Sequence, residues 1–449
     1  MSDQPARSSS AAGAVTESED TVTFSELFAL REYRALFLSG IVNWIGDYLS
    51  RAAITVLVYQ QSRSVLLSAV AFAIPYLPWL VGPLLSALAE RYPYRRVIIA
   101  ADLSRMVLIG LLLLPGLPIP VMLGLVFLAS LGAPPAQAAR SAMLPLVVPR
   151  EHLALALATN QTSGQAAQVV GYLTGSALAV ALTPRIALGI DVLTFAVSAV
   201  VVAYGIRHRP TARARSERTH LLRETAEGFS LVFGDRVLRS IALVVFTMTV
   251  FAIVPEGLAA AWAAEGTSGT TVPGLDQGMI MAAGPLGFVI GGLLFNRLVP
   301  AARRARLLPL LAVLAPLVLI PTIIGPSALV VASLVLLSGT VQGAIMPTLN
   351  ATFVLALPNG YRARAFGVVN SGIQLSQLSA VVITGTLADH FWLPLVVGLW
   401  SVGGTLAMLL AAVFWPRPVT FAEAAEKASA GDQIPPPRTP TTSVTPERP

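Results

Sequence analysis

The sequence is poor in charged residues and contains no cysteine. Charged side chains make up 12% of its 449 positions, about half the share found in ordinary soluble domains. Without cysteine, disulfides, thiolate nucleophiles and cysteine-ligated zinc are excluded. Apolar residues make up 55% of the chain, and the mean hydropathy is +0.72. A water-soluble surface does not tolerate this composition, so a soluble enzyme is excluded.

Lysine and histidine are scarce as well. The only lysine among 30 basic residues is Lys427, in the context Ala-Glu-Lys-Ala. The Gly-Lys-Ser/Thr sequence of an ATPase phosphate loop is therefore missing. The four histidines are not at metal-ligand spacing, and the chain has no Gly-x-Ser-x-Gly nucleophile elbow. We expect no enzyme activity, no metal site and no cofactor.

Long apolar runs fill the chain between two polar ends. We predict a disordered N-terminal segment at 1–30, without the apolar core of a signal peptide, and a disordered Pro-rich tail at 416–449. The runs between them are long enough to cross about 30 Å of hydrocarbon. The predicted fold class is an all-α polytopic membrane protein with twelve transmembrane helices. These helices are expected at residues 35–60, 65–89, 97–115, 119–139, 155–181, 186–206, 240–262, 277–296, 307–323, 327–350, 365–387 and 391–415.

The arginines predict the orientation of these helices. Of the 30 basic residues, 26 fall in segments on one side, whereas the opposite loops contain only Arg63 and Arg185. Because basic residues are retained on the cytoplasmic side, both termini are predicted to be cytoplasmic, in a bacterial inner membrane. The same rule explains the net charge of +7 without nucleic-acid binding.

The two halves of the chain repeat at an offset of 209 residues. The longest predicted cytoplasmic connection, a linker at 207–239, separates a six-helix bundle at 31–206 from another at 240–415. Each half has an even number of spans, so the copies are parallel, as in one class of secondary transporters. The matching pairs are Asp47 and Glu256, Gly82 and Gly291, Arg95 and Arg304, Pro149 and Pro358, and the stripes Gln161, Gln165, Gln168 and Asn370, Gln374, Gln377.

Charged residues inside hydrocarbon are costly and are therefore candidates for function. Asn43, Asp47 and Arg51 are spaced i, i+4 and i+8 on the first predicted helix and share one face. Asp47 is about 18 Å from the inner end of this helix. We expect Asp47 and Arg51 to form a neutral pair, so that protonation of Asp47 would release Arg51 and favour another helix packing. The alternative is a static ion pair that locks the helix.

Glu256 follows Pro255 in the seventh predicted helix, with no arginine nearby on that helix. An unpaired carboxylate is costly in hydrocarbon, so burial favours the neutral, protonated form of Glu256. A proton-coupling group needs this readiness to take up a proton. The proline supports a local break that would line a cavity. The alternative places Glu256 at the outer headgroup boundary.

The remaining charges inside the spans are predicted to be structural. Asp102 and Arg105, spaced i, i+3 on the third helix and one to two turns inside its cytoplasmic end, are expected to form an ion pair that joins the span to the Arg-rich loop. Asp191 is near the outer end of the sixth helix, where it can pair with Arg185.

The two amide stripes each occupy one face of a helix, at spacings i, i+4 and i+7. Together with Asn43, they either orient a substrate in a cavity or form hydrogen bonds between helices worth about 1 kcal/mol each. Two Gly-x-x-x-Gly motifs, Gly171 to Gly175 and Gly287 to Gly291, are predicted to be close helix contacts.

Several of these segments resemble the major facilitator superfamily. The run from Gly82 to Arg96 resembles its loop signature, a Gly-rich helix end followed by an acidic-Arg pair and further basic residues. The resemblance extends over residues 25–417 and is strongest to the macrolide-efflux-type branch of drug:proton antiporters and the related siderophore exporters. The segments similar to that branch are Gly46-Asp-Tyr-Leu-Ser-Arg51, Asp102-Leu-Ser-Arg105, Ala133-Pro-Pro-Ala-Gln-Ala-Ala-Arg140 and Val254-Pro-Glu-Gly257.

The resemblance implies a gating role for the loop that follows Gly82. Glu90 takes the position of the family's aspartate, and Arg91, Arg95 and Arg96 take its basic positions, so the loop would latch the two halves in the outward-open state. The longer side chain of Glu90 implies a looser latch, as does Ser86 in place of the usual glycine. The fifth helix lacks the Gly-Pro pair common in antiporters, which leaves the direction of transport open.

These features together predict a secondary active transporter that works by alternating access. The expected activity is proton-coupled efflux of a small amphiphilic organic compound, drug- or macrolide-like. The alternatives are an uncoupled facilitator, a lysolipid or siderophore transporter, and a non-transporting membrane sensor or scaffold. The expected partners are the lipid bilayer, a small-molecule substrate and protons, and the expected state is a monomer.

Overall fold

The computed structural model describes residues 23–82, 84–85, 91–209, 221–265, 273–357 and 361–415, and every regular element within these ranges is a helix. This confirms the all-α fold class. The predicted tail and most of the predicted N-terminal segment lie outside the described residues. Nine helical segments in the described part are long and apolar enough to cross a membrane, namely Arg31–Ser62, Ile119–Val147, Pro184–Gly205, Arg236–Gly257, Gly274–Phe295, Arg306–Ile324, Ala328–Leu355, Arg364–Ala388 and Leu393–Val413.

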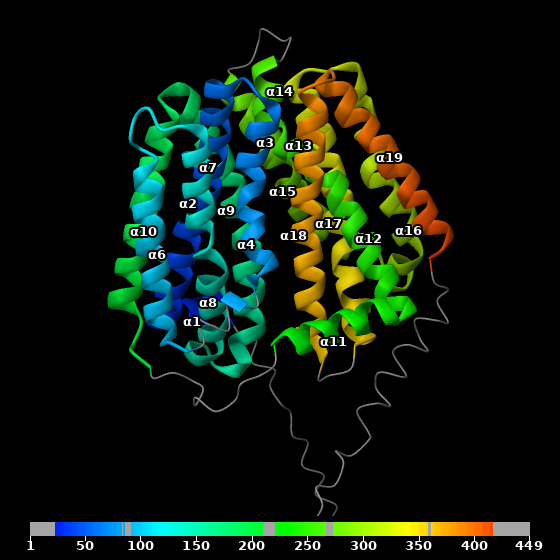
Figure 1. Cartoon of the computed structure of the whole chain (residues 1–449). Helices are drawn as coiled ribbons and strands as arrows, with labels where there is room; N and C mark the ends of the chain where they lie inside the picture. The colour runs from blue at the N-terminus through cyan, green and yellow to red at the C-terminus, as the bar shows by residue number, and fades with distance from the viewer. Residues whose placement is uncertain are drawn as a thin grey trace, which may run out of the picture.

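The helices stand side by side in two groups, with α1 to α10 on the left of Figure 1 and most later helices on the right. The first group contains α1 (Phe24–Ala29), α2 (Arg31–Ser62), α3 (Val65–Ala73), η1 (Ile74–Tyr76), α4 (Leu77–Leu80), α6 (Tyr94–Leu111), α7 (Ile119–Ser130), α8 (Ala133–Val147), α9 (Leu153–Ala181) and α10 (Pro184–Gly205). The later helices are α11 (Leu221–Gly234), α12 (Arg236–Ala252), α13 (Val254–Gly257), α14 (Ala259–Glu265), α15 (Pro273–Leu298), α16 (Ala301–Leu317), η3 (Ile320–Ile324), α17 (Ala328–Leu355), α18 (Arg362–Ala388) and α19 (Leu393–Val413).

Three predicted spans fall short of the length or hydropathy of the other nine. The second predicted span is divided into α3, η1 and α4, because Pro75 and Pro78 cannot donate backbone hydrogen bonds. Helix α6 contains buried Asp102 and Arg105, and α9 contains the amide stripe. The residues that lower the hydropathy of α6 and α9 are thus the ones that the sequence marks as candidates for function.

Two predicted irregular segments are partly helical. Residues 24–29 form α1 rather than a disordered segment, because Thr23 and Glu26 cap its first turn and Leu27 is fully buried. The predicted linker contains α11, which lies across the ends of the other helices at the bottom of Figure 1. Helix α11 packs against α18, and Glu227 Oε2 lies 2.7 Å from an Arg364 guanidinium nitrogen.

The predicted small-residue contacts bring helices close together. A Cβ atom on Gly171 would lie 2.6 Å from the Tyr48 Cβ, so α9 lies directly against α2. Helices α15 and α17 meet in the same way, with Gly287 against the backbone of α17 at Leu336 and Thr340. The prediction that both Gly-x-x-x-Gly motifs are close contacts is confirmed.

The two groups are joined at the end of the molecule that contains α14, here named the α14 face. Asp389 at the end of α18 caps α3 of the other group: its Oδ1 accepts from the backbone N–H groups of Val65 and Leu66, at 2.6 and 3.2 Å. Its Oδ2 accepts from Ser64 Oγ at 2.7 Å. A carboxylate at a helix N-terminus satisfies free N–H groups and complements the helix dipole.

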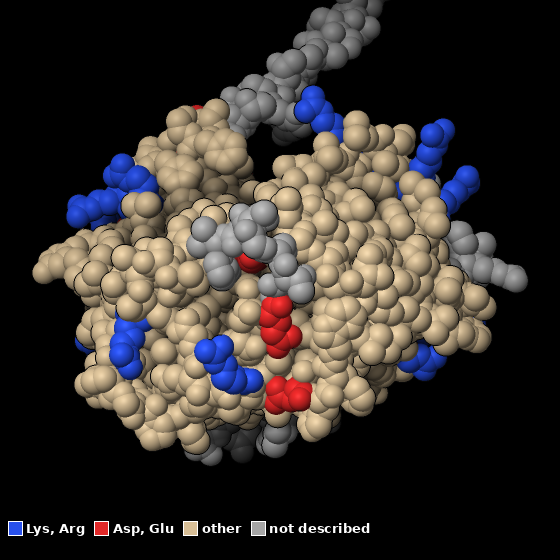
Figure 2. Space-filling view, turned by 90° about the horizontal axis from the view of Figure 1, so that it is seen from above, with Lys and Arg blue, Asp and Glu red and all other residues tan. Residues whose placement is uncertain are grey.

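Three more hydrogen bonds hold this end closed. Tyr59 Oη donates to Glu265 Oε1 at 3.1 Å. Gln277 of α15 donates to the Ala52 carbonyl and the Thr55 hydroxyl of α2, at 3.1 and 3.0 Å. Figure 2 looks onto the α14 face, where acidic side chains gather in a short row near the middle of a mostly uncharged surface.

Candidate functional site

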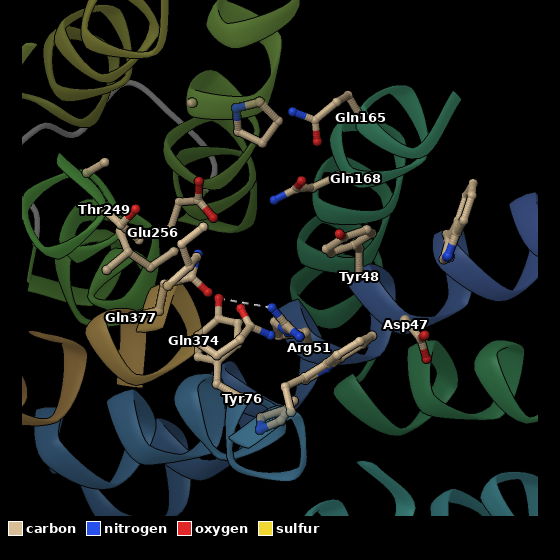
Figure 3. Close-up of a pocket in the computed structure, with 18 of the residues that line it drawn as sticks. Asp47, Tyr48, Arg51, Tyr76, Gln165, Gln168, Thr249, Glu256, Gln374 and Gln377 are labelled. Atoms are coloured by element: carbon tan, nitrogen blue, oxygen red, sulfur yellow. Dashed lines mark hydrogen bonds between the residues drawn. The ribbon is translucent and has the colours of Figure 1, made fainter. Parts of the chain in front are cut away.

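A cavity of about 630 Å³ lies between the two groups of helices. Its wall combines apolar and aromatic side chains with charged groups and amides, a composition typical of a small-molecule site. Figure 3 shows part of this wall, with residues from α2, α9, α13 and α18 pointing into one space. The polar side chains that line it include Asn43, Asp47, Tyr48, Arg51, Tyr76, Arg105, Gln137, Arg140, Gln165, Gln168, Glu256, Gln342, Gln374 and Gln377.

A second and wider cavity, of about 1400 Å³, continues from the first. The two share Trp44, Tyr48, Gln165 and Phe288 among other residues, so they form one chamber. The wider part is lined by residues near the first turns of α2, α9, α12 and α18 and near the last turn of α17. These ends lie on the side of α11, here named the α11 face. The chamber therefore widens toward the α11 face, and the contacts between the two groups close the α14 face.

Asp47 forms an ion pair with Arg105 of α6. Arg105 also donates to Asn43 Oδ1 at 3.2 Å, and its guanidinium carbon lies 4.5 Å from the centre of the Phe195 ring. The expected pair of Asp47 and Arg51 is therefore wrong. Arg51 turns into the cavity, and in Figure 3 Asp47 points away from Glu256.

Asp102 is fully buried at the centre of four helices. It accepts from Asn43 Nδ2 at 2.8 Å and from Ser198 Oγ at 2.6 Å, and its charge partner is Arg140 of α8 at 3.4 Å. The expected pair of Asp102 and Arg105 is thus wrong, because Arg105 reaches across to α2. Arg140 was not among the charges predicted to lie inside a span, because the fourth predicted helix ends one residue before it, whereas α8 continues to Val147.

Asp191 is also buried, with 1% of its surface exposed. Its Oδ1 accepts from Thr194 Oγ1 of the same helix at 3.0 Å, and its Oδ2 has no hydrogen-bond partner in the described part of the chain. The expected pair with Arg185 is not formed. A Cβ atom on Gly46 would collide with the Asp191 carboxyl group, so this group lies against α2 next to Asp47.

Arg51 is surrounded by aromatic rings. Its guanidinium carbon lies 5.7 Å from the ring centre of Tyr48, 5.4 Å from that of Phe72 and 5.0 Å from that of Tyr76. It donates one hydrogen bond to Tyr76 Oη at 3.2 Å. This cage could not be predicted from the sequence, because Phe72 and Tyr76 come from the α3–η1 segment and are brought to Arg51 only by the fold.

Glu256 lies in α13, the short turn at which the seventh predicted span is broken. The chain leaves α12 at Ile253, passes through Pro255 and continues in α14 after Leu258. The break expected at the proline is therefore present, and it places Glu256 on the wall of the cavity. Glu256 is 9% exposed, and its Oε2 has no partner among the described residues.

The amides of both stripes face the chamber. Gln165, Gln168, Gln374 and Gln377 line the narrow part, from α9 and α18. Gln161 and Asn370 line the wide part. All ten residues predicted for proton coupling or for the substrate cavity thus line this chamber.

The gating motif is described only in part. Gly82 is buried, with Pro134 as its nearest neighbour, and Glu90 lies outside the described residues. Arg91 and Arg96 are exposed. Arg95 donates to the Ala203 carbonyl at the end of α10, a contact within the first group of helices.

The sequence matches a known family over most of its length. The family model of the Major Facilitator Superfamily matches residues 36–360 and 257–445. Macrolide efflux protein A of Streptococcus pyogenes is 24% identical over 233 residues, which cover 50% of this chain and 56% of that protein. The chain thus spans about half the length of the curated relatives that it matches.

Solved transporter structures share the fold at low identity. A POT family transporter in complex with 5-aminolevulinic acid has a TM-score of 0.67 at 12% identity, over 86% of this chain and 96% of that one. A bacterial homolog of the human lysosomal transporter Spinster, in an inward-facing and unoccupied conformation, has a TM-score of 0.64 at 12% identity, over 90% and 99%. The matched residues, the helical fold and the chamber agree: this chain belongs to the major facilitator superfamily and resembles its macrolide-efflux branch.

Proposed function

We propose that the chain is a secondary active transporter that couples proton movement to the efflux of a small amphiphilic organic compound. It acts by alternating access as a monomer in a bacterial inner membrane, with both termini in the cytoplasm. The observation that carries this proposal is the chamber: it is open at the α11 face, closed at the α14 face, and lined by the repeat-related carboxyl groups of Asp47 and Glu256.

The two carboxyl groups take different parts in the proposed cycle. Asp47 is held by Arg105, so protonation of Asp47 would release a cation that links α2 to α6. Glu256 has an unpartnered carboxyl oxygen at the break in the seventh span, where backbone and side chain can rearrange together. A change in protonation at either site thus alters the contacts that hold one arrangement of helices.

The matched relative supports the direction of transport. It is a macrolide efflux protein, and the helix motifs around Asp47 and Glu256 resemble those of that branch. The mixed wall of aromatic rings, amides and a few charges suits an amphiphilic organic molecule.

Proteoliposomes test the proposal directly. Substrates are first selected by a growth-inhibition panel that compares hosts with and without this chain, and substrate-driven proton flux is then measured for the wild type, Asp47→Asn, Glu256→Gln and the double variant. We expect coupled flux to fall at least tenfold in each single variant, whereas Glu151→Gln, at an exposed position, keeps it. Unchanged coupling in the double variant would remove both carboxyl groups from the mechanism.

The alternatives give other outcomes in the same assays. Transport that ignores an imposed pH gradient would identify an uncoupled facilitator. Deletion of residues 418–449 leaves the flux of a transporter intact, whereas a scaffold would lose its output.

A further inference from the structure

We propose that the substrate carries an anionic group, a carboxylate or a phosphate ester, on an apolar body, and that Arg51 binds this group. The inference deepens the proposed function and rests on it only in taking the chamber as the substrate site.

The other charges that the first group places on the chamber wall are paired. Asp47 pairs with Arg105, and Arg140 pairs with Asp102, which is buried behind the wall. Arg51, by contrast, has no carboxylate within ion-pair distance in the described ranges of the chain. Buried or membrane-embedded arginines are normally paired. An arginine held at a cavity without a partner is therefore suited to a charge that a ligand brings.

The aromatic cage holds Arg51 without neutralising it. The three rings stabilise a cation through their faces, while Tyr76 occupies one of the five N–H donors of the guanidinium. The remaining donors are in a planar fork whose geometry matches a carboxylate or a phosphate. Gln374 and Gln377 line the same cavity as Arg51 (Figure 3), and their amide groups can supply further donors.

Glu256 does not reverse the preference of the chamber for an anionic ligand, although it lines the same chamber. A carboxyl group can be neutralised by a proton, whereas a guanidinium keeps its charge at every physiological pH. Of the two unpaired groups, only Arg51 thus provides a permanent charge, and it is positive. Trp44, Trp79 and Phe288 line the same cavity and offer apolar surface to the body of the ligand.

Binding to the purified full-length protein in nanodiscs of uncharged lipid tests this inference without any transport assay. The probes share one naphthyl body and differ in charge: naphthoate, naphthyl phosphate, naphthylmethyl-trimethylammonium and naphthalenemethanol. We expect the two anions to bind at least tenfold more tightly than the alcohol, the fold-change of a charge-assisted contact worth about 1.4 kcal/mol. The cation is expected to bind most weakly.

Variants test whether the preference for anions comes from the side chain of Arg51. Arg51→Gln should abolish the difference between anions and alcohol while keeping binding of the alcohol, and Arg51→Lys should retain part of it. Arg185→Gln, in the first turn of α10 at the α14 face, is the matched control and keeps the wild-type preference. Preferred binding of the cation, or an anion preference that survives in Arg51→Gln, would overturn the inference.

Two further arms identify the source of the anion. Inorganic phosphate and acetate test whether the charge alone suffices, and lysophosphatidic acid tests a lipid headgroup. If phosphate and acetate displace the naphthyl anions but lysophosphatidic acid does not, the requirement for an apolar body is overturned. If the anion preference is found but proton coupling is absent, the proposed function fails and the substrate class stands.

Discussion

At the scale of single residues, the buried Asp102 shows how a charge is accommodated in this protein. Its carboxylate is satisfied by Asn43, Ser198 and Arg140, which come from three different helices. Removing one partner of a buried ion pair leaves the other charge uncompensated, which costs more than the pair contributes. Asp102 therefore stabilises the packing of α2, α6, α8 and α10.

We expect Asp102→Ala to lower the free energy of unfolding by about 3–5 kcal/mol, because Arg140 is left buried and unpaired. Ser198→Ala, which removes one hydrogen bond to the same carboxylate, should cost only about 1–2 kcal/mol. Thermal unfolding of the purified protein in detergent measures both. Equal losses in the two variants would contradict a role for the Asp102 charge.

The sequence predicts which charged residues are embedded, but it does not predict their partners. Spacing along one helix favours Asp47 with Arg51 and Asp102 with Arg105, since both pairs share a face. The actual partners are contributed by neighbouring helices, because the side chain of Arg105 reaches α2 and Arg140 enters from α8. Helix rotation and register decide such contacts, and neither can be read from local spacing.

At the scale of the elements, the contact between α15 and α17 depends on glycine. A Cβ atom on Gly291 would collide with the backbone of Thr340, whereas a Cβ atom on Gly124 in α7 meets nothing within 4 Å. Gly291→Ala is expected to destabilise the protein by about 1–3 kcal/mol, and Gly124→Ala to stabilise it by about 0.5–1 kcal/mol. Thermal unfolding of the two variants gives shifts of opposite sign if the close approach is required.

The cap of α3 by Asp389 joins elements of the two groups, so its loss should change conformation as well as stability. Asp389→Ala removes three hydrogen bonds across the α14 face. We expect it to cost about 1–2 kcal/mol and to shift the equilibrium toward opening at this face by about 5- to 30-fold.

Distances between spin labels measure this opening. The chain has no cysteine, so labels can be attached to cysteines introduced at the exposed residues Leu182 and Ile324. Asp235→Ala is the matched control, because Asp235 caps α12 within its own group. A distance distribution that does not change in Asp389→Ala would show that the cap is not a closing contact.

The sequence predicts the membrane-spanning helices better than it predicts the structure of the linker between the two bundles. Apolar runs and proline positions locate the spans and the break at Glu256, because both are local properties. Helix α11 was missed, since it lies in a predicted linker and its apolar face is covered only after α18 and α12 have packed beside it.

At the scale of the whole molecule, the repeat explains why the candidate residues converge. The offset of 209 residues relates Asp47 to Glu256 and one amide stripe to the other, and both members of each pair line the same chamber. The sequence therefore predicts the lining. It does not predict which end is closed, because the sealing contacts of Gln277 and Asp389 belong to no repeated motif.

The distribution of arginine also predicts how the whole molecule is oriented. Because 26 of the 30 basic residues are expected on one side, Arg185→Cys should react with a membrane-impermeant maleimide on intact cells, and His208→Cys should react only after the cells are permeabilised. Arg185 lies in the first turn of α10 and His208 follows its last residue, Gly205, by three positions, so the two report on the two ends of a single span. The reverse labelling pattern would invert the topology, and the chamber would then open to the outside, which is inconsistent with loading a substrate for efflux from the cytoplasm.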